Sequence, residues 1–469
     1  MRLLNVQSMK LEEYFGSQIP PYAILSHCWG SGEVTFEEIN GPSWHQKEGA
    51  KKLKLASQQA EKEGLEYVWI DTCCIDKTSS AELSEAINSM YTWYEQAVVC
   101  VAYLEDIVGK DIENSKWFTR GWTLQELVAP TNIMFYDGLW NILGTKIQLV
   151  SLLSRITSIS EDVLVDPSRR YNASVARKMS WASKRETTRL EDVAYSLLGI
   201  FNVNMPLLYG EGQRAFTRLQ EEILKETDDH SLFAWTVFPT SNLNNTAYTP
   251  GLGASDLKEG FLSILAESPA NFRYSGDIVP YPSTSRGQPC SMTSRGLSIE
   301  ARIRNDDTAG LECHQEGDFH YSVGIAIAYV GNENIYRRAW NPGFMWVPEK
   351  YWAGKKTKAI FIAKNLPRIV PKNVYRIDLI SDKDFGNSAT VDLLAPSPRD
   401  CIWKRGDRTV QISPEIFPGD IHMLFVIRSY STGIAFVVNY TLTAKEYTIP
   451  LTAARTLFQG VTPVRSPAL

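Results

Sequence analysis

The stretch that decides the fold covers residues 65–104 and reads LEYVWIDTCCIDKTSSAELSEAINSMYTWYEQAVVCVAYL. Its two ends, 65–71 and 98–104, are apolar runs rich in Val, Ile and aromatic residues, a composition typical of buried strands. Between them, Ser79 and Glu82 have the spacing of a capping box, which predicts the start of a helix. The apolar residues that follow this cap recur at helical intervals: Leu83, Ile87, Met90, Tyr91 and Tyr94. The order strand, helix, strand predicts a βαβ unit with parallel strands.

The same alternation continues on both sides of this unit. Tyr22–Ser26 predicts a strand before it, and Lys51–Lys62 predicts a helix that Gly64 ends. On the other side, residues 122–128 predict a short helix that Pro130 ends. Ile133–Tyr136 then predicts a fourth strand. The repeated alternation predicts an α/β fold on a parallel sheet.

Helical patterns dominate from Lys146 to Glu226, and we expect these helices to cover the sheet. Residues 1–230 are therefore predicted to form one α/β domain with an added helical section.

The remaining chain has a different pattern. Residues 231–255 are a predicted linker, because Pro239–Ser255 is rich in Asn, Thr, Gly and Ser. In residues 256–469 the hydrophobic period changes to two, as at Ser298–Arg304, and turn clusters separate the runs. This part is predicted to be a β-rich sandwich or barrel.

Composition narrows the function classes. The 469 residues include 48 Lys and Arg against 53 Asp and Glu, so the chain lacks the basic excess of most nucleic-acid binders. No stretch approaches the 18 or so apolar residues that span a bilayer, so no membrane partner is expected. The seven cysteines are odd in number and show no repeated C-x-x-C spacing, which disfavours disulfides and a zinc site. We expect a cytoplasmic protein without a bound metal.

Polar and aromatic residues gather where the predicted strands end. In an open parallel sheet, ligands bind outside the carboxyl ends of the strands. The residues that this rule selects are Ser26, His27, Trp29, Asp71, Arg120, Trp122 and Glu126.

Four segments of the chain resemble a known protein family, and the first three contain these candidate residues. They are Tyr22–Gly30, Trp69–Lys77, Trp117–Leu127 and Asn204–Gly212. All four resemble the fungal heterokaryon-incompatibility (HET) domain, and the resemblance spans roughly residues 1–225. It implies a protein that acts in non-self recognition and triggers programmed cell death. The β-rich remainder resembles a companion domain that follows HET domains in many fungal proteins.

The HET domain is more distantly similar to Toll/interleukin-receptor (TIR) domains. Their flavodoxin-like sheet carries a glutamate that cleaves NAD, in a Trp-x-x-x-Glu-Leu pattern that Trp122–Leu127 matches. The resemblance implies that Glu126 is catalytic, that NAD or a related nucleotide is a substrate and not a cofactor, and that the protein self-associates on activation. The protein or ligand that triggers this activation is unknown.

The chemistry of nicotinamide supports a carboxylate in this role. Nicotinamide leaves as a neutral molecule from a cationic ring, so the reaction needs a group that stabilises oxocarbenium-like charge more than it needs an acid. In this reading Glu126 performs that task, Trp29 and Trp122 stack on the bases, and Arg120 pairs with the pyrophosphate. Asp71, Ser26 and His27 contact the ribose or its neighbours.

Other interpretations remain open from the sequence. Glu126 can instead favour the dipole of its helix, and Asp71 can cap the following turn. Cys73 with His27 is a possible nucleophile and base, although His27 cannot serve its sequence neighbour Cys28. The protein can also be a non-enzymatic module that signals by oligomerising, or its β-rich domain can bind a carbohydrate or peptide.

Overall fold

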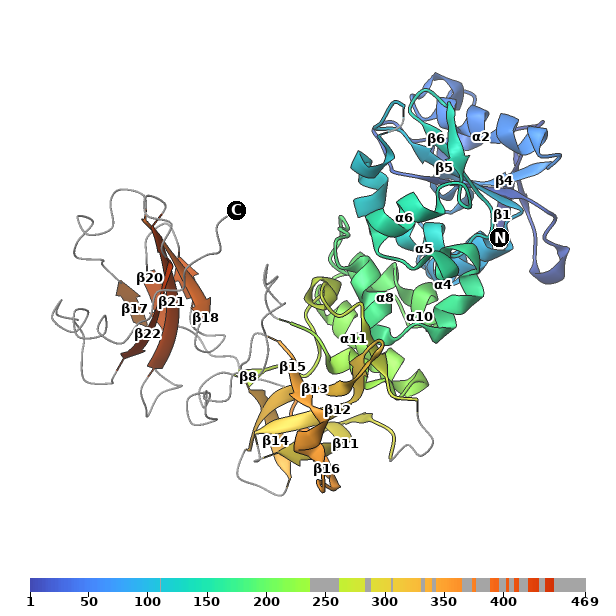
Figure 1. Cartoon of the computed structure of the whole chain (residues 1–469). Coiled ribbons are helices and arrows are strands. Elements are labelled where there is room, and N and C mark those ends of the chain that lie inside the picture. Colours follow the sequence, from blue (N-terminus) through green and yellow to red (C-terminus); the bar gives the residue numbers. More distant parts are fainter. Residues whose placement is uncertain are drawn as a thin grey trace. The chain divides into compact units, whose positions relative to one another are not determined.

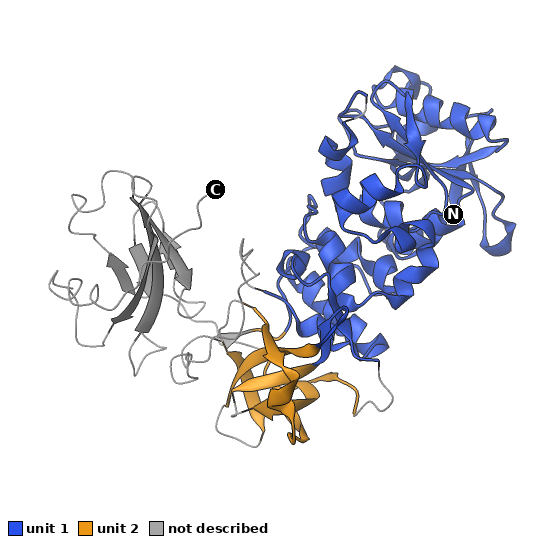
Figure 2. Ribbon diagram, viewed as in Figure 1, with its two compact units in different colours: residues 1–241, 265–286, 312–319 blue, residues 242–264, 287–311, 320–469 orange. Residues whose placement is uncertain are grey.

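The computed structural model describes residues 1–109, 111–236, 261–282, 288–304, 307–329, 334–339 and 343–364, together with isolated strands between 373 and 442. The chain divides into two compact units (Figure 2). Unit 1 comprises residues 1–241, 265–286 and 312–319, and unit 2 comprises 242–264, 287–311 and 320–469. The predicted linker segment Pro239–Ser255 lies outside the described residues.

A mixed seven-stranded sheet organises unit 1, with the strand order β2-β1-β4-β3-β5-β6-β7. Its four central strands are parallel: β4 (Tyr67–Trp69), β3 (Ala23–His27), β5 (Val99–Leu104) and β6 (Ile133–Asp137). When these four strands are numbered by their order along the chain, their spatial order across the sheet is 2-1-3-4. Flavodoxin-like sheets have this order. The predicted α/β fold is confirmed.

The edges of this sheet differ from the prediction because they are antiparallel. The edge strands are β1 (Arg2–Asn5), β2 (Leu11–Glu13) and β7 (Ile142–Thr145). They are three or four residues long and half polar, so their hydrophobic pattern is too short to reveal them. β1 buries Leu3 and Leu4 completely, whereas β2 and β7 bury no side chain fully and depend mainly on backbone pairing with a neighbouring strand.

Helices cover both faces of the sheet. In Figure 1, α2 (Ala50–Lys62) lies on the opposite side from α4 (Ser80–Gln96) and α5 (Thr123–Val128). The other helices of unit 1 are α1 (Phe36–Ile39), α3 (Asp71–Cys74), α6 (Val150–Thr157), α7 (Glu161–Val165), α8 (Val175–Ala182), α9 (Asp192–Tyr195), α10 (Leu198–Phe201) and α11 (Arg214–Glu226). None of the described helices is long and apolar enough to cross a membrane.

Local sequence signals explain where the main helices begin and end. Gly64 has a φ of +73°, a left-handed conformation that stops α2. Ser79 caps α4, since its side chain accepts a hydrogen bond from the Glu82 N–H at 3.3 Å. The expected capping box is incomplete, because the Glu82 carboxylate accepts the N–H of Asp76 at 2.9 Å instead.

Aromatic side chains fill the core beneath α4. The ring of Trp69 lies 5.6 Å from that of Trp93 and 5.9 Å from that of Tyr94, both edge to face. The Tyr94 hydroxyl donates to the Leu25 carbonyl at 3.0 Å, which ties α4 to β3. Part of the large aromatic content of the chain is therefore core packing.

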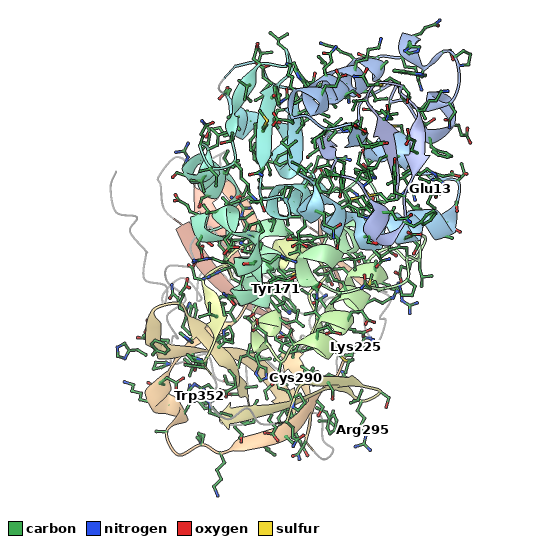
Figure 3. The ribbon with its side chains drawn as sticks, turned by 90° about the vertical axis from the view of Figure 1, so that its right-hand side faces the viewer. Glu13, Tyr171, Lys225, Cys290, Arg295 and Trp352 are labelled. Atoms are coloured by element: carbon green, nitrogen blue, oxygen red, sulfur yellow. The ribbon has the colours of Figure 1, made fainter. Side chains whose placement is uncertain are left out.

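Unit 2 contains a small closed β-barrel, which confirms the β-rich prediction. The strands of the ring, in order, are β11 (Gly296–Arg304), β12 (Thr308–Gln315), β13 (Asp318–Tyr329), β14 (Ile335–Ala339) and β16 (Thr357–Ile362). The ring closes because β11 pairs with both β12 and β16. Short strands extend it: β8 (Phe261–Leu262), β10 (Ser291–Thr293) and β15 (Met345–Pro348). Trp352, labelled in Figure 3, packs against Gly310, and its Nε1 donates to Ser322 Oγ at 2.6 Å.

The remaining strands lie outside the barrel. β9 (Ile278–Pro280) pairs with residues 313–315 at the end of β12, and both of these segments belong to unit 1. Near the C-terminus, β17 (Asn373–Arg376), β20 (Thr409–Ile412) and β19 (Ile402–Lys404) form one three-stranded sheet. A second contains β18 (Ala389–Ala395), β21 (Ile421–Ser429) and β22 (Ala435–Leu442).

The contact between α10 and α4 has no room for a side chain at Gly199. A Cβ there would lie 2.0 Å from the Cβ of Tyr91, so we expect Gly199→Ala to lower the free energy of unfolding by about 1–3 kcal/mol. Urea denaturation measures this change. Gly41→Ala is the matched control, because the nearest atom to its new Cβ is 3.3 Å away. Equal losses in both variants would contradict the packing argument.

Candidate active site

The candidate site lies at the carboxyl ends of three neighbouring strands. β3 ends at His27, β4 leads directly into α3 at Asp71, and β5 ends at Leu104 before the chain runs on to α5. Because these strands are parallel, their carboxyl ends meet at one edge of the sheet. Helix α5 carries Glu126 at this edge.

Contacts at both ends fix the position of α5. At its start, the Thr123 hydroxyl donates to the carbonyls of Trp117 and Arg120. At its end, the buried Lys146 ammonium lies 2.7 Å from the Pro130 carbonyl and 3.4 Å from the Val128 carbonyl. Burial lowers the pKa of Lys146 to about 7. Sequence reasoning missed Lys146, because its only local context is a polar turn.

Glu126 ends a chain of buried hydrogen bonds. Its side chain is 7% exposed, and the Ser26 hydroxyl donates to its Oε2 at 2.5 Å. The indole Nε1 of Trp117 donates in turn to Ser26 Oγ at 2.8 Å. Both donors are completely buried, and the Tyr94 hydroxyl is a further hydrogen-bond partner of the carboxyl. This arrangement holds one carboxyl oxygen in place and orients the other.

The surroundings of Glu126 favour its protonated form. Burial, followed by the negative charge of Asp71, raises its pKa to about 8 from an ordinary value of 4.5. The hydrogen bond from Ser26, the hydrogen-bonding contact with Tyr94 and the charge of Arg120 act in the opposite direction. A carboxyl group with a pKa near neutral can both accept and release a proton at physiological pH.

Arg185 is a candidate site residue that sequence reasoning missed. Its Nη1 donates to the Arg120 carbonyl and to Thr123 Oγ1, both at 2.8 Å, while its buried Nη2 has no hydrogen-bond partner. Burial lowers its pKa to about 9, against the opposing charge of Glu126. The guanidinium thus stays charged at neutral pH beside the catalytic candidate, with one donor available to an anionic group. Only the fold brings residue 185 to this edge.

Trp29 and Asp71 also meet at this edge, as predicted from their strand-end positions. The Trp29 indole, 50% exposed, donates to Asp71 Oδ2 at 2.7 Å. The Lys77 ammonium lies 3.5 Å from the centre of the Trp29 ring, a cation–π contact. Burial lowers the pKa of Lys77. An exposed aromatic face held by two charged residues is suited to stacking against a planar group.

His27 lies on the other side of β3 from Ser26. Its side chain is 1% exposed, and neither ring nitrogen has a hydrogen-bond partner. Its Nε2 lies 3.8 Å from Glu33 Oε2 and 4.0 Å from Asp71 Oδ1. Burial lowers its pKa, so the imidazole is neutral at pH 7.

Arg120 and Trp122 contact the segment that approaches the site from the helical section. Arg120 pairs with Glu186 in a parallel β-bridge, and its Nη1 lies 3.4 Å from Thr188 Oγ1. The Trp122 side chain hydrogen-bonds Asp192, a different partner from the Glu126 cluster. Stacking and pyrophosphate roles for these two residues stay predictions.

The cysteines at the site are not activated. Burial raises the pKa of Cys28 to about 11. The Cys73 thiol is completely buried, and its pKa is raised well above its usual value by its contact with Cys74 and by burial. A nucleophilic cysteine needs a lowered pKa, so this environment argues against a cysteine hydrolase.

Comparisons with known proteins bear on the same region. The family model described as heterokaryon incompatibility protein (HET) matches residues 22–110, which include Ser26, His27, Trp29 and Asp71. Vegetative incompatibility protein HET-E-1 of Podospora anserina is 42% identical over 224 residues, 45% of this chain. This chain carries a HET domain. The resemblance seen in the sequence motifs is confirmed.

Outside residues 22–110, the comparisons say less about this chain. A family described as a domain of unknown function (DUF8212) matches residues 214–296. The match to HET-E-1 spans only 16% of that protein's length. No solved structure matches the chain.

Because Glu126 is buried, we expect the free energy of unfolding to depend on the ionisation of its carboxyl group. The folded-state pKa of Glu126, about 8, exceeds its ordinary value of 4.5. The stability gained from protonated Glu126 is therefore complete below about pH 4.5 and is lost as the pH rises to about 8. We expect Glu126→Gln, which stays neutral, to gain stability relative to the natural protein across this window, by roughly 1.4 kcal/mol per pKa unit.

Urea unfolding at pH 5, 7 and 9 measures this difference. Glu85→Gln is the control, because Glu85 is exposed on α4. A constant difference between Glu126→Gln and the natural protein at all three values would show that Glu126 ionises normally.

Proposed function

We propose that this chain is an effector of fungal vegetative incompatibility, the process in the name of its relative HET-E-1. In this proposal the HET domain is the part that initiates cell death, and the β-barrel unit senses a partner or restrains the HET domain. The family match and the sequence identity support the proposal at the level of the HET domain.

We propose further that the HET domain hydrolyses NAD to nicotinamide and ADP-ribose. The observation that carries this proposal is Glu126, a buried carboxyl with a pKa near 8, oriented by Ser26 and Trp117 at the carboxyl edge of a parallel sheet. Perturbed ionisable groups at such edges are candidates for catalysis. The match of Trp122–Leu127 to the TIR pattern points to the same residue.

The reaction assigns a role to each state of Glu126. The bond between the ribose carbon and the nicotinamide nitrogen breaks, and its electron pair leaves with the neutral nicotinamide. The ionised Glu126 carboxylate stabilises the positive charge that develops on the ribose. Water then bonds to that carbon and gives its proton to Glu126, whose raised pKa suits it to accept a proton at neutral pH.

The positive charge of bound nicotinamide favours the carboxylate form. A cation placed within a few ångströms of a buried carboxyl lowers its pKa. In the free protein the protonated form of Glu126 avoids a buried charge, and substrate binding itself promotes the ionised, reactive form.

We also propose that activity depends on self-association. A continuously active NAD hydrolase would deplete the NAD of its own cell, and the Glu126 carboxyl is almost completely enclosed in the single chain. Assembly of several chains provides a means to open this edge.

Nicotinamide release tests the catalytic proposal directly. We expect the purified full chain, at rising concentration or fused to an inducible dimerisation module, to release nicotinamide from NAD. Glu126→Ala is expected to lower this release by at least about a hundredfold, the scale on which positioned acid–base groups contribute. Glu85→Ala is the matched control on the surface of α4.

The non-enzymatic alternative gives the opposite result. If no assembly condition yields nicotinamide while the protein still kills cells, the HET domain acts by recruiting partners. Release that is unchanged in Glu126→Ala would remove Glu126 from the mechanism.

The pH dependence of the reaction provides an independent test. Because the ionised carboxylate is the reactive form, kcat/KM is expected to rise with pH and to level off above about pH 8. Ser26→Ala removes a hydrogen bond that lowers the Glu126 pKa, so its profile is expected to shift to higher pH. A lower rate with an unshifted profile would mean that Ser26 supports the fold without tuning Glu126.

A further inference from the structure

Three polar side chains, those of His27, Glu33 and Asp71, converge on the opposite side of β3 from Glu126, and two of them, His27 and Glu33, carry buried atoms without a hydrogen-bond partner. The His27 Nε2 lies 3.8 Å from Glu33 Oε2 and 4.0 Å from Asp71 Oδ1, both beyond hydrogen-bond length. His27 and Glu33 Oε2 are buried and have no hydrogen-bond partner. Buried polar atoms are rarely left unpaired, so this gap is suited to a polar group from outside the chain.

Glu33 is held so that its second oxygen faces this gap. Its Oε1 accepts hydrogen bonds from the Lys52 ammonium at 2.5 Å and from the Gly30 N–H at 2.7 Å. Lys52 also pairs with Glu105 at 3.0 Å. The positive charge of Lys52 is therefore shared by two carboxylates, and the gap keeps an acidic character.

The geometry favours a hydroxyl over a metal ion. The ligand atoms of His27, Glu33 and Asp71 do not all come within 4.8 Å of one another, as a shared ion of ordinary bond length requires. One hydroxyl oxygen in hydrogen-bond contact with two groups separates them by about 4 Å when the two contacts, each about 2.8 Å long, meet near a right angle. A hydroxyl can donate to a carboxylate and exchange a hydrogen bond with a neutral imidazole.

This gap adjoins the Glu126 site. Asp71 faces His27 and also raises the pKa of Glu126 by its charge. The Lys52 ammonium that pairs with Glu33 also donates to the Cys28 carbonyl at 3.3 Å, and the exposed Trp29 indole donates to Asp71 at 2.7 Å. These contacts connect the gap to the strand-end residues of the candidate site.

We propose that Glu33, His27 and Asp71 bind the hydroxyls of the adenosine ribose of NAD, and that their carboxylates make the HET domain select NAD over NADP. This inference rests on the proposed function, which supplies NAD as substrate. Acidic side chains recognise a free ribose diol in other dinucleotide sites, whereas a 2′-phosphate requires a cation. Here the added phosphate would meet Glu33, Asp71 and Glu105, with Lys52 already engaged.

Calorimetric titration of the full chain with ADP-ribose and with its 2′-phosphate tests the selectivity. Neither molecule contains the nicotinamide bond, so the measurement does not depend on catalysis. We expect ADP-ribose to bind at least about tenfold more tightly, because placing like charges together costs at least the 1.4 kcal/mol that a tenfold ratio represents. Glu33→Gln is expected to reduce the ratio to about threefold or less.

The controls separate selectivity from folding. Glu37→Gln changes an exposed carboxylate four residues away and is expected to keep the full ratio. Asp71→Asn provides a second variant if circular dichroism shows that Glu33→Gln is unfolded. Three results would overturn the inference. The natural protein could bind the two molecules equally or bind neither of them, or folded Glu33→Gln and Asp71→Asn could both keep the full ratio.

Failure of this inference differs from failure of the proposed function. A protein that releases nicotinamide equally from NAD and NADP hydrolyses dinucleotides without the proposed selectivity. A protein that binds ADP-ribose selectively and releases no nicotinamide has the subsite without the reaction.

Discussion

The burial of Glu126 is the constraint on which the site depends. A carboxyl group removed from water at the end of a β-sheet is costly in its charged form, so its surroundings must supply hydrogen bonds or keep it protonated. Trp117 and Ser26 form a buried line of donors to one oxygen, and Lys146 holds the far end of the helix that carries it. The first two contacts join β3 and the segment before α5 to the Glu126 carboxyl, and the third fixes the end of α5.

The alternation of side chains along β3 divides the candidate site in two. Ser26 points toward α5 and Glu126, whereas the next residue, His27, points toward α2 and Glu33. Asp71, at the start of α3, acts on both halves.

Much of the fold was predictable because its central elements carry strong local signals. The four parallel strands are apolar runs, Gly64 ends α2 and Ser79 begins α4, so the bounds of these elements fall within about two residues of the prediction. The edge strands β1, β2 and β7 were missed, because a three- or four-residue strand depends on its neighbour for pairing. Closure of the barrel depends on a pairing between β11 and β12 that no local pattern specifies.

The sequence by itself determined the α/β class, the HET motifs and the choice of Ser26 and Asp71 as strand-end candidates, because hydrophobic period and motif residues are local properties. Glu126 was a candidate from the Trp122–Leu127 pattern on a predicted helix. Only the tertiary structure brought Glu33 and Arg185 to the candidate site and placed the Trp122 side chain against Asp192. The burial that raises the pKa of Glu126 to about 8 also depends on the tertiary structure. Burial, charge and contact depend on residues distant in the chain. Their effects on a side chain exist only once the fold has brought those residues together.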